Sequence, residues 1–509
     1  MKLSFVVTTT NKRRINTITL RPNNWDDFGF KTQFFASYYD DEGKELDIGI
    51  VKIGRFGQKE GWTRDILEES FSGLGNEYFS LGQDLDYYSN LAALNEAVAH
   101  RILTSLQDVV WFESQLQEAR AESVLTTSLL RYVSMSSIHH QFRRILSGGD
   151  VLTAFDFKYE REKSNTKSAV DLRFSVEPGS RPPTNMHVLI GRNGVGKTTV
   201  LNDMAHSIIR ERSNSKDFGC FYDLDGFGNS LIDASYFSCV VSVSFSAFDP
   251  FDPPEDQIDS NKGIRNFYIG LKTSGEAGLK GLEDLCEDFI ENFYACMNSK
   301  KKKGLWIESV EKLNSDVNFK EIKILDILPF MNDEKFDERL SSVYVRMSSG
   351  HAIVLLTLTR LIAHIEEKTL VLLDEPESHL HPPLLSAFTR TLSDLLIARN
   401  GVAIIATHSP VVLQEVPRSC VWKMHRVRLE GRANRPESET FGENVGTLTR
   451  EVFGLDVENS GFHALLRESV LSGKSYEEVL KEYNGQLGYE GRSVLRSLIS
   501  SHESGDDEL

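Results

Sequence analysis

The stretch Gly191-Arg192-Asn193-Gly194-Val195-Gly196-Lys197-Thr198 decides which fold this chain is expected to adopt. It matches the phosphate-loop pattern G-x-x-x-x-G-K-[ST] at every fixed position. The apolar run 186–190 before it predicts a strand. The apolar residues 201, 204, 205 and 208 after it follow the spacing of a helix with one buried face. In such a unit, backbone N–H groups and a helix N-terminus surround phosphate oxygens.

Each residue of this loop therefore receives a role. Lys197 is expected to reach the β- and γ-phosphates of ATP, and Thr198 is expected to hold Mg²⁺. The predicted ATP-binding residues of this stretch are Gly191, Arg192, Asn193, Gly194, Val195, Gly196, Lys197, Thr198 and Thr199.

The bulk composition is that of a soluble globular protein. The 509 residues, 40% hydrophobic and 26% charged, allow about two to four domains. No apolar run approaches the roughly 20 residues that span a bilayer, and five cysteines without metal-ligand spacing indicate reduced thiols in a cytoplasmic protein. The net charge of −17 argues against a surface that binds nucleic acid throughout.

A second cluster of chemistry follows the apolar run 369–373, which predicts a buried strand. Asp374 at its end is placed to act on Mg²⁺ or its water shell. Glu375, one residue further, is placed to polarise the attacking water as general base. A core strand that ends in two solvated acids is the alternative, and the phosphate loop in the same chain argues against it.

Two further segments are predicted to bind phosphate oxygens. Ser348, Ser349 and Gly350 precede the strongly apolar helix predicted for 352–365, where backbone N–H groups and a hydroxyl form an anion site. A plain helix cap is the alternative. His408 follows the predicted strand 401–406 and is placed to donate a hydrogen bond to a phosphate oxygen, with a purely structural histidine as the alternative.

Taken together, these four motifs resemble the ATP-binding-cassette (ABC) ATPases. The resemblance implies two heads that sandwich two ATP molecules. Ser348 and Gly350 would then contact the γ-phosphate held by the other subunit, and Ser349 is predicted with them as an ATP-binding residue. His408 would be the switch histidine that acts with Glu375 in catalysis. The chain departs from the pattern at His351, where glutamine or glutamate is usual, and at Ser349, where glycine is usual.

The loop after 239–245 is the other departure from the family. It usually carries a glutamine that contacts Mg²⁺, whereas this chain has Ser244, Ser246 and Asp249 there. Ser246 is the expected substitute, so the predicted metal-binding residues are Thr198, Asp374 and Ser246.

The segment 374–382 indicates which branch of this family the chain resembles. Its Glu-x-His-Leu-His-Pro form resembles the soluble AAA-type cassette ATPases related to the OLD, RecF and SMC groups. A metal site of Glu377, His379 and His381 is the alternative to the implied loop that touches the opposite subunit. About 100 residues separate Phe245 from Ser348, without the heptads of a long SMC-type arm, and 411–509 is too short for the Toprim nuclease of OLD proteins.

A head-only ATPase is therefore expected, similar to the ATPase subunits of the anti-phage Septu system and related retron systems. The resemblance implies an ATPase that dimerises around ATP with Mg²⁺ and regulates a separate nuclease effector in bacterial defence. A RecF-like DNA-repair ATPase that binds DNA itself is the alternative, and the basic residues 423–435 and 300–303 are either solvated or its contacts. The homodimer or higher homo-oligomer would have no membrane partner.

The expected fold class is α/β: an ABC-type P-loop ATPase head, with a mixed β-lobe and a parallel-sheet core, plus a helical N-terminal insertion and a helical subdomain. A separate N-terminal domain is the alternative to the insertion. The expected divisions are 1–59 (β-lobe, N-terminal part), 60–148 (helical insertion), 149–250 (β-lobe and P-loop core), 251–345 (helical subdomain), 346–430 (signature, Asp-Glu strand and switch histidine) and 431–509 (C-terminal helices with a disordered acidic tail from 500).

Overall fold

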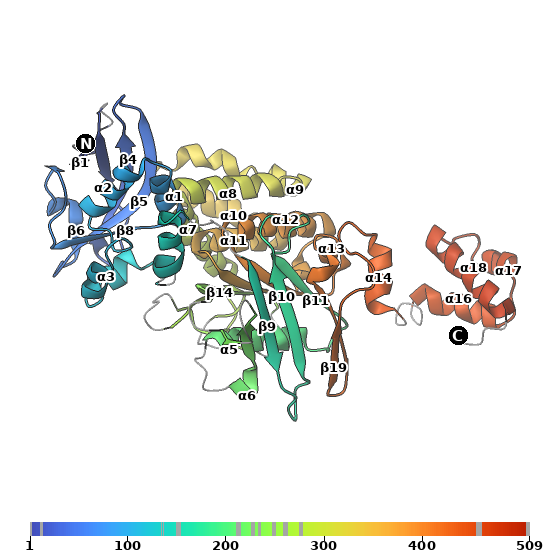
Figure 1. Cartoon of the computed structure of the whole chain (residues 1–509). Coiled ribbons are helices and arrows are strands. Elements are labelled where there is room, and N and C mark those ends of the chain that lie inside the picture. Colours follow the sequence, from blue (N-terminus) through green and yellow to red (C-terminus); the bar gives the residue numbers. More distant parts are fainter. Residues whose placement is uncertain are drawn as a thin grey trace.

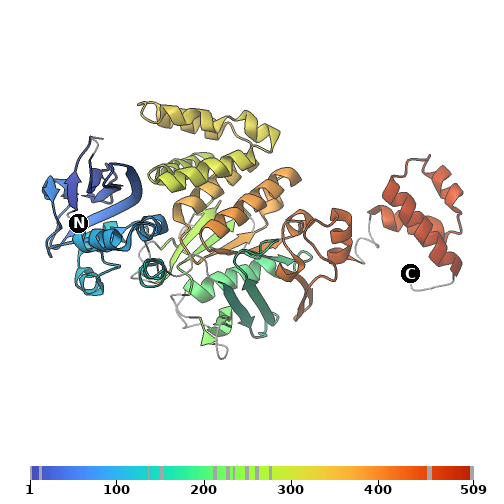
Figure 2. The same cartoon turned by 45° about the horizontal axis from the view of Figure 1, so that its top comes forward.

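The computed structural model describes residues 3–10, 14–133, 135, 137–148, 154–209, 215–224, 230–232, 236–246, 251–257, 263–273, 278–454 and 461–504. Figures 1 and 2 show three parts in chain order: an N-terminal unit (3–148), a central head (154–454) and a group of C-terminal helices (461–504) that stands apart from the head in both views. Within these ranges, no helix combines the length and apolar character that a bilayer crossing requires.

The N-terminal unit is built on a six-stranded sheet in the order β7-β1-β2-β4-β5-β8, with a short β3–β6 pair beside it. Its strands are β1 (Ser4–Val7), β2 (Thr17–Pro22), β3 (Phe30–Lys31), β4 (Gln33–Tyr39), β5 (Glu45–Arg55), β6 (Gly61–Trp62), β7 (Ser70–Phe71) and β8 (Tyr78–Gly82). Its helical segments are η1 (Thr63–Asp65), α1 (Leu85–Ala92), α2 (Glu96–Ser105), α3 (Glu113–Ala119), η2 (Leu125–Leu129), η3 (Ser137–Phe142) and α4 (Arg143–Leu146).

This unit has its own hydrophobic core, so two expectations need correction. The strands of 1–59 pair with one another and with β7 and β8, rather than with the sheets of the head. The stretch 60–148 begins with strands before its helices. Every residue of β8 is buried, so its apolar residues do not alternate with polar ones, and periodicity cannot separate such a run from a buried helix.

A buried ion pair holds the unit together. Asp27 and Lys52 are both about 1% exposed, and the Lys52 ammonium lies 2.7 Å from the Asp27 carboxylate. That carboxylate also accepts hydrogen bonds from Ser128 Oγ at 2.7 Å and Arg131 Nη1 at 3.0 Å. Burial lowers the pKa of Lys52, and Asp27 opposes the shift.

Asp27→Ala is therefore expected to lower the free energy of unfolding by about 3–5 kcal/mol, because it leaves a buried ammonium without its carboxylate. Urea denaturation followed by tryptophan fluorescence measures the change. Asp65→Ala is the matched control. It removes an exposed pair with Arg64 and should cost less than about 1 kcal/mol. Equal shifts for the two variants would contradict the prediction.

The head contains two sheets. The antiparallel one has the order β10-β9-β12-β13, from β9 (Phe155–Arg161), β10 (Val170–Val176), β12 (Cys220–Asp223) and β13 (Ser230–Leu231). The core sheet has the order β15-β14-β16-β17-β11-β18-β19 and is parallel except for β19. Its strands are β11 (Met186–Ile190), β14 (Cys239–Ser244), β15 (Arg265–Gly270), β16 (Thr369–Asp374), β17 (Val402–Thr407), β18 (Val421–Val427) and β19 (Glu430–Asn434).

Helices cover this core sheet and form a subdomain beside it. They are α5 (Lys197–Ile209), α6 (Ser215–Phe218), α7 (Leu282–Met297), α8 (Lys300–Leu313), α9 (Val317–Glu321), η4 (Ile324–Phe330), α10 (Phe336–Val345), α11 (Ser349–His364), η5 (Pro376–His379), α12 (Pro382–Ala398), α13 (Pro410–Leu413), η6 (Arg418–Cys420) and α14 (Val445–Phe453). α11 is buried from Gly350 to Ala363. The expected helical subdomain also contributes a strand, because β15 pairs with β14 at the sheet edge.

The C-terminal helices α16 (Gly461–Leu471), α17 (Tyr476–Glu482) and α18 (Tyr489–Ser504) pack around a small core of their own. α18 continues through Ser504, so the expected disorder from residue 500 is wrong for 500–504, and 505–509 lie outside the described residues.

The lysine run 300–303 joins the N-terminal unit to the head. Lys301 pairs with Asp86 of α1, and Lys302 Nζ donates to the Ala363 carbonyl at 2.7 Å. Burial lowers the pKa of Lys302 to about 8. These two lysines lie on α8, which begins at Lys300, and not on a loop. Lys302 is partly buried, whereas Lys301 is exposed and pairs across the junction.

Candidate nucleotide site

The core sheet brings three of the predicted motifs together. β16, β17 and β11 are neighbours and run parallel, so their carboxyl ends meet at one edge. The P-loop follows β11, His408 follows β17, and Glu375 follows β16. Ligands in open parallel sheets bind at such an edge, and residues far apart in sequence thereby form one site.

The P-loop adopts a backbone that its glycines make possible. Gly194 and Gly196 have φ angles of +80° and +98°, a region that residues with a side chain rarely adopt. A Cβ atom on Gly191 would lie 2.3 Å from the Met424 carbonyl oxygen of β18. The loop therefore lies close against the sheet and ends where α5 begins at Lys197.

Lys197 is almost fully buried beneath this loop. Its ammonium donates to the Gly191 and Arg192 carbonyls at 3.1 and 3.3 Å and lies 2.7 Å from His408 Nε2. Burial lowers the pKa of Lys197 to about 8, while Glu375 and other nearby carboxylates act to raise it. A phosphate that reaches Lys197 would give it an anionic acceptor in place of these neutral ones.

This pKa predicts how ATP affinity depends on pH. Below about pH 8 Lys197 is charged with or without ATP. Above it, the nucleotide-free protein loses a proton that ATP binding must restore, so Kd for ATP should rise about tenfold per pH unit. Titrations between pH 7 and 9.5 measure this effect. Lys197→Arg, which stays protonated, should flatten the profile, and a flat wild-type profile would contradict the prediction.

Glu375 occupies a backbone conformation that is uncommon for a residue with a side chain, with φ +44° and ψ 58°. Its N–H donates to the Ala406 carbonyl at 2.8 Å, which continues the β16–β17 ladder, and its Oε1 lies 3.1 Å from His408 Nε2. Such outliers cluster at functional sites. The conformation turns the carboxylate towards His408.

His408 is held from two sides. Its backbone N–H donates to Glu377 Oε1 at 2.5 Å, a contact that sequence reasoning did not assign. Burial and then Lys197 lower the pKa of the ring, while Glu375 acts to raise it. Nε2 accepts a hydrogen bond from Lys197 only when it carries no proton, and it donates a hydrogen bond to Glu375 only when it carries one, so the two contacts alternate.

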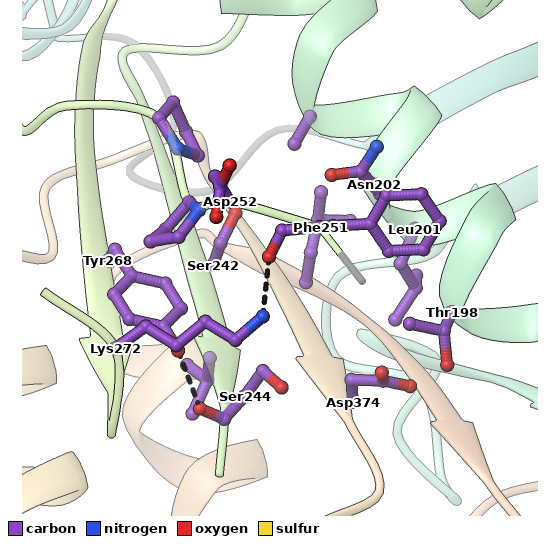
Figure 3. Close-up of a pocket in the computed structure, with 15 residues that line it drawn as sticks. Thr198, Leu201, Asn202, Ser242, Ser244, Phe251, Asp252, Tyr268, Lys272 and Asp374 are labelled. Atoms are coloured by element: carbon purple, nitrogen blue, oxygen red, sulfur yellow. Dashed lines mark hydrogen bonds between the residues drawn. The ribbon is translucent and has the colours of Figure 1, made fainter. Parts of the chain in front are cut away.

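A small cavity of about 70 Å³ lies where Mg²⁺ is expected (Figure 3). The hydroxyl of Thr198 and the carboxylate of Asp374 line it together, and oxygen ligands of this kind suit Mg²⁺. These two side chains would hold the ion, which would neutralise phosphate charge when bound. Among the described residues, no group of three His, Cys, Asp or Glu side chains is placed to hold a metal, so water and phosphate oxygens would complete its shell.

The end of β14 brings Ser244, rather than Ser246, to this cavity. Ser244, whose carbonyl accepts from the Tyr268 hydroxyl at 3.0 Å, lines this cavity, and Ser246 is not among its lining residues. Lys272 donates to the Phe251 carbonyl at 2.6 Å on the same wall (Figure 3). The metal role of Ser246 stays a prediction, and Asp249 lies outside the described residues.

The alternative metal site of Glu377, His379 and His381 is wrong for this structure. Glu377 binds the His408 backbone, His379 Nε2 lies 3.3 Å from the Phe245 carbonyl, and His381 Nε2 lies 2.8 Å from Asp316 Oδ2. The three side chains therefore have three different partners.

The signature residues begin α11. Ser348 is its N-cap and accepts from the His351 N–H, Ser349 is the first helical residue, and both serines are exposed. Gly350 is buried, and a Cβ there would lie 2.4 Å from the His379 carbonyl oxygen. The start of α11 is thus a serine-capped helix end, and its two serine residues are exposed.

The basic residues 423–435 are largely engaged within the chain. Lys423 pairs with Glu451 at 2.5 Å, and Arg435 stacks 3.6 Å over the Trp422 ring. Arg426 Nε donates to the Arg428 carbonyl at 2.6 Å. Arg428 and Arg432 of this hairpin are exposed, and contact of these residues with DNA stays a prediction.

Comparison with known proteins shows the family to which the chain belongs. Protein ea59 of Escherichia phage lambda is 48% identical over 507 residues, which cover 96% of each chain. The chain belongs to the ea59 family. The family model described as "AAA domain, putative AbiEii toxin, Type IV TA system" matches residues 305–414, which contain the signature, Asp374, Glu375 and His408.

Solved structures with a similar fold include two ATPase cassettes. The ADP conformation of an ATP-binding cassette of an ABC transporter has a TM-score of 0.31 and 17% identity over 61% of this chain and 100% of its own. CbiO1 of Clostridium perfringens, part of an ABC transporter complex, has a TM-score of 0.31 and 14% identity over 63% of this chain and 96% of its own. This ea59-family chain is a P-loop ATPase, with a parallel core sheet, a P-loop and an Asp-Glu strand end.

Proposed function

We propose that this protein is an ABC-type ATPase that dimerises around ATP and Mg²⁺ and regulates a separate nuclease effector in anti-phage defence. One observation supports the proposed dimer. Lys197, Glu375 and His408 meet at one strand edge, while the signature hydroxyls of Ser348 and Ser349 are exposed at the start of α11. Each chain thus presents half of a phosphate site, and a second copy would supply the rest.

The proposed cycle follows from the contacts of His408. Without ATP, Lys197 donates to its ring. When the γ-phosphate draws Lys197 away, Nε2 is free to carry a proton and to donate to phosphate or to Glu375. Glu375 then orients and deprotonates the attacking water as general base, and loss of the γ-phosphate reopens the dimer.

The nucleoside would lie beside the P-loop. A cavity of about 500 Å³ there is lined by Val195, Val170, Met424, His425 and Arg432, among others. This volume is within the usual range of small-molecule sites. Apolar side chains and a histidine offer stacking surface for a base, next to the loop that would hold its phosphates.

A separate effector would bind outside the nucleotide site. The chain outside the head consists of a β-rich unit and a small helical group, each with its own core, and these are the surfaces available to a separate subunit.

Subunit mixing tests the shared site. Lys197→Ala and Ser348→Ala should each hydrolyse ATP only slowly on their own, because each removes one half of every site. A mixed dimer keeps one intact site, formed by the P-loop of one subunit and Ser348 of the other. Mixing equal amounts should restore about a quarter of the wild-type ATPase rate, since half of the dimers are mixed. Absence of any recovery would sink the shared-site proposal.

A further inference from the structure

A buried carboxylate joins two of the segments that the proposed dimer brings to its interface. Asp316, about 6% exposed, caps α9 by accepting the Phe319 N–H at 2.8 Å. Its Oδ1 lies 3.2 Å from His351 Nε2, and its Oδ2 lies 2.8 Å from His381 Nε2. One carboxylate therefore connects α9, the signature helix and the segment after Glu375.

The other nitrogen of His351 contacts the signature serine. Nδ1 lies 2.9 Å from Ser348 Oγ, and the ring packs edge-on against Phe319, with centroids 5.6 Å apart. Gly350 lies against the His379 backbone, so the signature and the residues before His381 are close-packed as well. Ser348, exposed to solvent, is the outer end of this chain of contacts.

The protonation of Asp316 decides which atom donates in each of these hydrogen bonds. Burial of Asp316 opposes ionisation, but the Phe319 N–H and the two histidines more than offset this effect and hold the pKa of Asp316 below its usual value. An ionised carboxylate only accepts, so both histidines donate from Nε2. His351 Nδ1 contacts Ser348 Oγ. When Nδ1 also carries a proton it donates to Oγ, which leaves the serine proton free for a phosphate oxygen; when it carries none, it takes that proton as acceptor.

We propose that Asp316 and His351 are positioning residues that aim the Ser348 hydroxyl at the γ-phosphate of ATP held by a second copy of this chain, and that His381 ties the segment after Glu375 to the same carboxylate. The inference rests on the proposed shared site. A plain N-cap needs only the serine, whereas here a histidine and a buried aspartate orient it. Loss of either positioning residue should slow closure and hydrolysis without weakening ATP binding at Lys197.

Two substitutions of His351 separate its contacts. His351→Gln places an amide near the position of Nε2, so it keeps the hydrogen bond to Asp316 and loses the contact with Ser348. His351→Asn places an amide near the position of Nδ1, so it keeps the contact with Ser348 and loses the hydrogen bond to Asp316. A purely structural brace predicts that His351→Gln behaves like wild type, whereas aiming of Ser348 predicts a fall in kcat of about 10-fold to 100-fold, with KM for ATP changed less than twofold.

The aspartate and the second histidine have their own variants. Asp316→Asn keeps an oxygen for the Phe319 N–H and removes the charge, and should lower kcat as His351→Gln does. Asp333→Asn is the matched control, because Asp333 caps an exposed turn of the same subdomain without contact to the signature. His381→Ala should reduce ATP-dependent dimer formation, and His381→Gln, which replaces Nε2 with an amide nitrogen, should restore it.

The decisive measurement combines these variants with Ser348→Ala and with Glu375→Gln. If His351 acts through Ser348, the double variant Ser348→Ala/His351→Gln should be no slower than Ser348→Ala alone. In the Glu375→Gln background, light scattering with ATP should show fewer dimers for His351→Gln. Fully additive losses, or wild-type kcat in both His351→Gln and Asp316→Asn, overturn the positioning role. A Glu375→Gln parent that stays monomeric with ATP overturns the proposed dimer and the positioning role together.

Discussion

Glu375→Gln is expected to lower kcat for ATP hydrolysis by about 10²-fold to 10⁴-fold while ATP still binds. The carboxylate lies 3.1 Å from His408 Nε2 at the end of β16, and glutamine keeps its shape but cannot take a proton from water. Because ATP would then persist, the variant should accumulate as an ATP-bound dimer. Phosphate release and light scattering with ATP and Mg²⁺ measure the two effects.

Glu377→Gln provides the control for this variant. Glu377 accepts the His408 N–H, and the oxygen of a glutamine can accept it too, so its kcat should fall far less. Hydrolysis at the wild-type rate by Glu375→Gln would show that another group serves as the base.

Lys197→Ala is expected to weaken ATP binding by the equivalent of about 2–5 kcal/mol, or roughly 30-fold to several-thousand-fold. It removes the buried ammonium that would meet the β- and γ-phosphates and leaves their charge unbalanced. Equilibrium binding of a fluorescent ATP analogue measures the loss.

Lys312→Ala is the matched control, because Lys312 is a partly exposed lysine of the same head that pairs with Glu308 and Asp394 and lies outside the proposed nucleotide site. Thermal melting of both variants separates a binding defect from misfolding. Binding of ATP by Lys197→Ala with wild-type affinity would contradict the role of the P-loop.

Local sequence patterns were sufficient to predict the structure wherever the residues that set it lie in one short segment. The P-loop could be predicted because Gly194 and Gly196 adopt positive φ angles within the loop itself. The buried helix α11 and the strand that delivers Asp374 follow from continuous apolar runs. An α/β head with a parallel core sheet follows from strand, loop and helix in that order, as the structure confirms.

Patterns failed where a residue's role depends on a partner distant in sequence. The N-terminal strands gave no sign of which sheet they would join, because edge pairing depends on the whole surface of the unit. The positions of charged residues could not be predicted for the same reason. Lys302 and Arg435 look solvated in sequence, yet Lys302 binds a carbonyl of α11 and Arg435 stacks on Trp422.

The sequence by itself determined the P-loop, the Asp-Glu strand end, the place of His408 after a strand and the Ser348 helix cap, because each is a short segment that carries its own signal. Only the tertiary structure decided that Glu377 holds His408 and that Asp316 joins His351 to His381. These contacts connect residues about 30 or more positions apart. Packing of the parallel sheet and the helical subdomain brings them within hydrogen-bond distance, and no local spacing encodes that packing.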